Sequence, residues 1–162
     1  MKSWNERTHE IAYLLNPAFC GRLLYTAINE YEHKAQHGFP FPLAYLVLPL
    51  VLHKQTRSQI SSRTQLLQWI HANQYLLIGF ARRTRDLVVI TNEALELLLQ
   101  SGMVQITQSG ELSISKSQKA LSKKRFIDSE IKECITKSEH VARWFANTGK
   151  IETIYISLGV RP

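Results

Sequence analysis

Residues 87–115 read LVVITNEALELLLQSGMVQITQSGELSIS. In this stretch a leucine-rich helical run, Thr91–Ser101, stops at Gly102, and two short segments of alternating character follow at 103–107 and 111–114. A helix, a glycine and then a small hairpin are the order of elements in a winged helix. The sequence therefore predicts a mainly α protein with a small β-hairpin, organised as a winged-helix-like domain with added N- and C-terminal helices.

The register of the predicted hairpin follows from the length of its loop. In an antiparallel pair, directly opposed residues share a face of the sheet. A two-residue loop at 109–110 would mix polar and apolar side chains on each face, whereas a three-residue loop at 108–110 pairs Ile106 with Leu112 and leaves one face apolar. A half-buried hairpin requires such a face. The three-residue loop also puts Gly110 where a positive φ is needed.

Helices are predicted over most of the remaining chain. Asn16-Pro17 is an N-cap followed by proline at the first helical position, and it starts a helix that we expect to end near Gln36. We expect further helices at 5–14, 43–54, 66–70, 75–81 and 128–147, a stiff connector at 39–42, a polar loop at 55–62 and a strand at 151–158. Ser62 or Thr64 is the expected cap of the helix at 66–70, and Thr91 is one candidate start of the helix that precedes the hairpin.

The chain of 162 residues is most simply one domain. We expect an N-terminal helical part at 1–38, a winged-helix-like core at 42–115 and, at 116–162, a basic stretch followed by a helix and a strand tail. Two cysteines are typical of free thiols in a reducing compartment. The first residues lack the apolar run of a signal peptide, and the longest apolar run, 41–52, is shorter than the roughly 20 residues of a membrane-spanning helix. We therefore expect a cytoplasmic protein without a membrane segment.

Charge is distributed unevenly along this chain of net charge +7. No acidic residue occurs between His33 and Arg85, and Glu111 is the only one between Leu97 and Ile127. Such asymmetry indicates an anionic partner surface, most commonly nucleic acid. A solvated face, or a face that meets an acidic protein, is the alternative of about equal weight. The residues that we expect to contact phosphate are Arg82, Arg83, Arg85, Lys116, Lys119, Lys123, Lys124 and Arg125.

The helix that precedes the hairpin is a poor reading helix for DNA. Residues 93–100 carry two acidic side chains, no basic one and mostly leucines, whereas reading helices present basic or amide groups to the bases. The hairpin tip, 108–111, has no arginine that would enter a groove. This pattern favours a helix used as core or as a protein interface, with non-specific DNA contact at most.

Catalytic and metal-binding patterns are weak. His33 and His37 have the spacing of a zinc-ligand pair on a helix, but no second pair follows, and a solvated helix end is the favoured interpretation. Cys20 and Cys134 lack a CxxC partner, and neither a G-x-S-x-G motif nor a glycine-rich phosphate loop is present. A fold that brings Cys20 or a serine to a histidine remains the alternative. We expect no catalytic residue, no metal and no cofactor, and hence a protein that is not an enzyme.

Three segments together resemble a known family. They are WNER at 4–7 with LNPAF at 15–19, LVLPLVLHK at 46–54 with Arg57, and LGVRP at 158–162. In their order and spacing they resemble the middle component of bacterial three-component ABC systems, including the small subunit of Lamassu-type anti-phage and anti-plasmid defence systems. Within these motifs Asn16, Pro17, Phe19, Leu48 and Pro49 are expected to be structural.

The resemblance implies a non-catalytic adaptor in a defence complex. Such a subunit would link an SMC-like ABC ATPase to an effector subunit, often a nuclease, with double-stranded DNA as a further partner through the complex. The tail at 158–162 would then be a docking strand that adds to a partner's sheet. A free-standing winged-helix DNA-binding transcriptional regulator is the alternative function.

Overall fold

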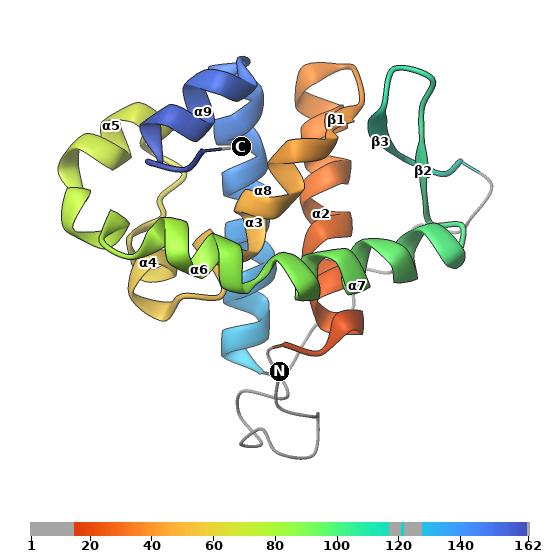
Figure 1. Ribbon diagram of the computed structural model, residues 1–162, viewed down its shortest axis with the longest axis horizontal. Coiled ribbons are helices and arrows are strands. Elements are labelled where there is room, and N and C mark those ends of the chain that lie inside the picture. Colours follow the sequence, from red (N-terminus) through yellow and green to blue (C-terminus); the bar gives the residue numbers. More distant parts are fainter. Residues whose placement is uncertain (1–14, 117–120, 122–127, 162) are drawn as a thin grey trace.

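Two long helices that run parallel to each other form the centre of the protein. The computed structural model describes residues 15–116, 121 and 128–161, so the helix expected at 5–14 lies outside the described residues. Helix α2 (Pro17–Ala35) packs along α8 (Ser129–Thr148), and α7 (Val88–Gln100) crosses α2 near one end of the pair (Figure 1). The short apolar helix α3 (Ala44–Val51) fills the space between them.

The predicted limits of α2 and α8 are confirmed by their caps. The Asn16 side chain accepts a hydrogen bond from the backbone N–H of Ala18 at 2.8 Å, and proline occupies the first helical position. Asp128 caps α8 by accepting from the backbone N–H groups of residues 130 and 131, and Gly149 ends the helix. Because these signals act within a few residues, sequence alone locates them.

The hairpin has the register predicted from the three-residue loop. Strand β2 (Val104–Ile106) pairs with β3 (Glu111–Ile114) so that Ile106 lies opposite Leu112, and Gly110 has φ +78°. A third strand, β1 (Phe39–Pro40), was not expected. It pairs with the other side of β3, which gives the order β1-β3-β2.

The connector expected at 39–42 is therefore only partly correct. Phe39 is fully buried and packs edge-on against Tyr31 of α2 with ring centroids 5.1 Å apart. Anchoring this ring in the core brings the backbone of residues 39–40 beside β3. Pro40 is compatible with that place because β1 is an edge strand, where a missing N–H costs little. The chain then continues as the 3-10 turn η2 (Phe41–Leu43).

The polar loop expected at 55–62 is wrong in its first half. Helix α3 ends at Val51 instead of continuing to Lys54, and residues 54–59 form α4 (Lys54–Gln59), which the His53 ring caps. A buried arginine in α4, Arg57, binds two carboxylates of α8 and thereby holds this polar segment in a helix. Sequence patterns do not report such a distant contact.

The segments that follow are three short helical pieces and α7. They are α5 (Leu66–Ala72), η3 (Gln74–Leu77) and α6 (Phe80–Asp86). The cap of α5 is Gln65, not Ser62 or Thr64, because Gln65 and Gln68 form a reciprocal capping box. Helix α7 begins at Val88 directly after α6, and Thr91 is a buried residue within it instead of its cap.

The strand expected at 151–158 is a helix, α9 (Ile151–Ser157). Ile154, Tyr155 and Leu158 are spaced as one face of a helix and are all buried against the core. Gly159 (φ +70°) ends the helix, with the N–H of Val160 bonded to the carbonyl of Tyr155 at 3.0 Å. Residues 158–161 thus end α9 in a turn and an extended segment, and the docking strand expected at 158–162 stays a prediction.

The residues of the sequence motifs start a helix or pack in the core, as expected. Asn16 and Pro17 start α2, Phe19 packs against the core, and Leu48 and Pro49 are buried in α3. Across the described parts of the chain, every helix is too short or too polar to cross a membrane.

Candidate functional site

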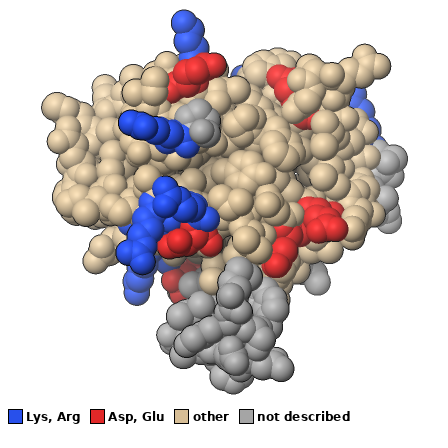
Figure 2. Space-filling view, in the orientation of Figure 1, with Lys and Arg blue, Asp and Glu red and all other residues tan. Residues whose placement is uncertain are grey.

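The structure does not gather the predicted phosphate-contacting residues on one surface. Arg82, Arg83 and Arg85 lie on α6, whereas Lys116 follows the hairpin at the opposite end of the long axis (Figure 1). Most Lys and Arg side chains visible in Figure 2 are on the α6 side of the molecule, with an acidic side chain among them, and a separate patch of Asp and Glu lies over α7. Lys119, Lys123, Lys124 and Arg125 lie outside the described residues.

Arg83 of α6 stabilises the fold through contacts within the chain. Its guanidinium donates to the carbonyl oxygens of Leu76 at 3.0 Å and Ile78 at 3.3 Å, and it lies 5.5 Å from the centre of the Phe80 ring. Burial lowers the pKa of this arginine from its ordinary value. The carbonyls that it binds end the η3 turn, so Arg83 joins η3 to α6 and has few donors left for a phosphate.

The other two arginines of α6 point to solvent. Arg82 is 86% exposed and lies 3.9 Å from the carboxylate of Asp86, a weak surface pair. Arg85 is exposed and lines a hollow in the surface.

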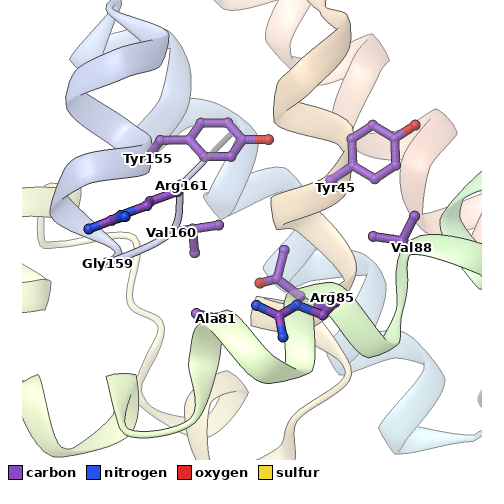
Figure 3. A pocket seen from close by; sticks show the side chains of 9 residues that line it. Tyr45, Ala81, Arg85, Val88, Tyr155, Gly159, Val160 and Arg161 are labelled. Atoms are coloured by element: carbon purple, nitrogen blue, oxygen red, sulfur yellow. The ribbon is translucent and has the colours of Figure 1, made fainter.

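This hollow has a volume of ≈ 540 Å³. Figure 3 shows Tyr45 of α3 and Val88 of α7 on one side, the end of α9 with the C-terminal segment on the other, and α6 below. Its lining residues are Tyr45, Ala81, Thr84, Arg85, Val88, Tyr155, Gly159, Val160 and Arg161. The last three belong to the LGVRP motif. The sequence therefore singled out this segment, but it did not predict a hollow beside it.

The two tyrosine hydroxyls at the hollow already have partners. Tyr155 donates to the carbonyl oxygen of Pro42 at 2.6 Å, and Tyr45 donates to the side-chain oxygen of Asn92 at 2.8 Å. Burial, with Tyr45 nearby, raises the pKa of Tyr155. Tyr155 therefore stays protonated near neutral pH, and because both hydroxyls already donate to other groups, the two rings act as walls of the hollow.

The helix before the hairpin presents no cation to solvent. The exposed residues of α7 are Val89, Asn92, Glu96, Leu97 and Gln100. This outer face combines apolar, amide and acidic groups, which repels phosphate instead of attracting it.

The candidate nucleophiles are inaccessible. Cys20 and Cys134 are both fully buried free thiols. Burial, with a smaller effect of Cys134, raises the pKa of Cys20 to about 12, and burial raises the pKa of Cys134 to about 11. A thiol with such a pKa forms almost no thiolate at neutral pH. His37, at the end of α2, lies 3.3 Å from Glu111 of β3, and no group of three potential metal ligands forms among the described residues.

Several large apolar side chains are exposed at the end of the molecule formed by α5, η3 and α9 (Figure 1). Ile78 is 79% exposed, Ile156 76%, Tyr75 61% and Leu67 50%. Another exposed apolar residue, Ile106, is 53% exposed on the hairpin at the opposite end. Sequence patterns did not single out the first four residues.

Comparison with known proteins assigns the family. Searches of the curated proteins and of the solved structures gave no match, so the winged-helix likeness stays a prediction. The family model for middle component 3 of ABC-three component systems matches residues 4–162, nearly the whole chain. The chain therefore belongs to the middle component 3 family of ABC-three component systems.

Proposed function

We propose that this chain is a non-catalytic adaptor that links an SMC-like ABC ATPase to an effector subunit, expected to be a nuclease, in a defence complex of the Lamassu type. Membership of the family makes the chain a component of a multi-component ABC system. The proposal adds the role of that component and the kind of subunits that it joins.

The observation that carries the adaptor role is the exposed apolar end formed by Leu67, Tyr75, Ile78 and Ile156. Each of these side chains gains free energy when a partner removes it from water, by about 25 cal/mol per Å² of apolar surface. Several large apolar residues exposed at one end of a small protein are typical of a protein interface.

The outer face of α7 favours protein partners over DNA reading. It carries no basic group, and its exposed amides Asn92 and Gln100 already bond to other side chains of this protein. A free-standing regulator needs free basic or amide groups on that helix and a second copy for the other half-site. Non-specific contact of the complex with double-stranded DNA would then use the exposed Arg82 of α6, because phosphate contact needs charge but no base recognition.

The absence of catalysis is part of the same proposal. Support comes from the two thiols, which are buried and protonated. Free thiols are also typical of a reducing cytoplasm, which is where an adaptor of an ATP-dependent defence complex would act.

Co-expression tests this function. The full chain, carrying an affinity tag, is expressed with the other two components of its own system and purified, and the eluted complex is sized by chromatography. We expect all three subunits in one complex. A variant with Ile78→Asp and Ile156→Asp should retain less than a tenth of the partners, while Ile106→Asp, which changes a half-exposed isoleucine at the other end, should retain them.

Two results would contradict the adaptor role. One is a wild-type chain that elutes alone despite expression of both other components. The other is a chain that forms a dimer by itself and shifts one defined DNA fragment, which is the behaviour of a regulator. Thermal unfolding of each variant shows whether loss of partners reflects loss of the fold.

A further inference from the structure

The hollow between α3, α6, α7 and the C-terminal segment contains two arginines without partners. Arg85 comes from α6, and Arg161 follows α9 (Figure 3). Neither guanidinium forms an ion pair or a hydrogen bond within the part of the chain that the structure describes. By contrast Arg57, Arg83 and Arg143 all bind carboxylates or carbonyls. The guanidiniums of Arg85 and Arg161 therefore keep their donors for a ligand.

The remaining walls of the hollow are mostly apolar. Ala81, Val88 and Val160 contribute aliphatic surface, and Tyr45 and Tyr155 contribute their rings. Because both tyrosine hydroxyls already donate to other groups, the free charged donors come from the arginines. A fitting ligand has anionic groups for the guanidiniums and an apolar body for the space between the walls.

The shape of the site favours a protein segment over DNA. A duplex offers phosphates along a convex, evenly charged surface and has no apolar group that would fill a hollow. A peptide that combines Asp or Glu with a larger apolar side chain satisfies both the arginines and the walls, because guanidinium groups bind carboxylates with two parallel hydrogen bonds.

We propose that this hollow binds an acidic peptide segment of a partner subunit, with its carboxylates on Arg85 and Arg161 and an apolar side chain between Val88 and Val160. The inference rests on the proposed adaptor function and deepens it, since it assigns one docking point to the LGVRP end of the chain. It also explains why Gly159 is useful there: its positive φ turns the chain back so that Val160 and Arg161 border the hollow.

The test uses the full chain and overlapping peptides that tile the sequences of the other two components. Binding is measured by fluorescence anisotropy. We expect the binding peptides to contain Asp or Glu beside an apolar residue and to weaken as salt rises, since the pairs lie at the rim. Arg85→Glu and Arg161→Glu should each weaken binding about tenfold or more.

Two further variants separate the hollow from general surface charge. Ala81→Trp keeps every charge but fills the space from an exposed position of α6, and it should weaken the same peptides about tenfold. Arg63→Glu reverses another exposed arginine, outside the hollow, and it should change affinity less than about twofold.

The outcomes distinguish this inference from the proposed function. If the intact wild-type chain assembles with its partners but no peptide binds, or if Arg63→Glu weakens binding as much as Arg85→Glu, the hollow is not the docking point and the adaptor role stands. Displacement of the peptides by short duplex DNA at the same site would likewise overturn the inference. A wild-type chain that binds neither component would overturn the adaptor role itself.

Discussion

Arg57 of α4 and Glu133 of α8 form a direct ion pair although 76 residues separate them in sequence. The Nε atom of Arg57 donates to Oε2 of Glu133 at 2.9 Å, Nη2 donates to Oε1 of Glu130 at 2.6 Å, and Nη1 donates to the carbonyl oxygen of Val51 at 3.0 Å. The Arg57 side chain is only 1% exposed, whereas the two glutamates are 40–45% exposed. One buried guanidinium thus joins α3, α4 and α8.

Replacement of Arg57 should destabilise the fold strongly. We expect Arg57→Met to lower the free energy of unfolding by about 3 kcal/mol, the lower part of the range for one partner of a buried pair, because the remaining carboxylates still reach water. Arg57→Lys should cost roughly 1–2 kcal/mol, since an ammonium group keeps the charge but loses hydrogen bonds of the planar fork. The midpoint of urea unfolding measures both changes. An Arg57→Met midpoint equal to that of the wild type would show that the network contributes nothing.

The protein should lose stability as the pH falls from neutral. The His53 ring caps α4 through Nδ1, which accepts from the backbone N–H of Thr56 at 3.4 Å. Burial, then the guanidinium groups of Arg83 and Arg57, lower the pKa of His53 from its ordinary 6.5. The folded state therefore favours the neutral ring, so its contribution is complete above pH 6.5 and is lost as the pH falls through the lower folded-state pKa. Burial lowers the pKa of His140 as well, which adds a loss of the same sign.

Unfolding temperatures measured across this pH range test the assignment to His53. Asn also accepts a hydrogen bond at an N-cap but does not titrate, so His53→Asn should flatten part of the decline. His71→Asn changes an exposed histidine and should leave the decline as it is. An unchanged slope in His53→Asn would mean that other groups cause the pH dependence.

Both native thiols should resist alkylation. Cys20 and Cys134 are buried, and burial raises the pKa of each to about 12 and about 11 respectively. Since only the thiolate reacts, iodoacetamide at pH 8 should label the folded protein only as fast as it unfolds, and mass spectrometry should find two labels after denaturation in urea. Ser109→Cys places a thiol in the exposed hairpin loop and should react within minutes under the same conditions. Rapid labelling of Cys20 or Cys134 in the folded wild type would show that the helices around them open readily.

Two glycine-to-alanine changes should shift stability in opposite directions. Gly21 lies inside α2, and an added methyl group would meet only ordinary contacts, 3.6 Å from the carbonyl oxygen of Ala94 and 3.7 Å from Leu98. Gly21→Ala should therefore stabilise the protein by about 0.5–1 kcal/mol through helix propensity. Gly159 has φ +70° with open space around it, so Gly159→Ala should destabilise by about 1 kcal/mol through backbone strain alone.

The midpoint of thermal unfolding distinguishes these two effects. Gly159→Asn serves as a control, because Asn tolerates the left-handed conformation better than Ala, and it should lie between wild type and Gly159→Ala. If Gly21→Ala destabilises the protein, then α2 and α7 do not tolerate even a methyl group at their crossing.

Sequence determined the elements whose signals are local. The Asn16-Pro17 start of α2, the Asp128 cap of α8 and the register across Gly110 all depend on residues within a few positions of one another. Cap hydrogen bonds and loop lengths act over that range, so the linear order of residues contains the whole signal. The helix followed by a hairpin was predictable for this reason, and the resemblance that the motifs supplied agrees with the family.

Tertiary packing decided the rest. The segment 151–158 has apolar residues that suit either a strand or a helix, and it became α9 because Ile154, Tyr155 and Leu158 bury against the core and Tyr155 bonds to Pro42, 113 residues away. In the same way, burial of the Phe39 ring brings the backbone of residues 39–40 beside β3, where it pairs as β1. The hollow with Arg85 and Arg161 joins residues from four parts of the chain. Such contacts depend on where helices that are distant in sequence meet in the fold. No local pattern of residues encodes that arrangement.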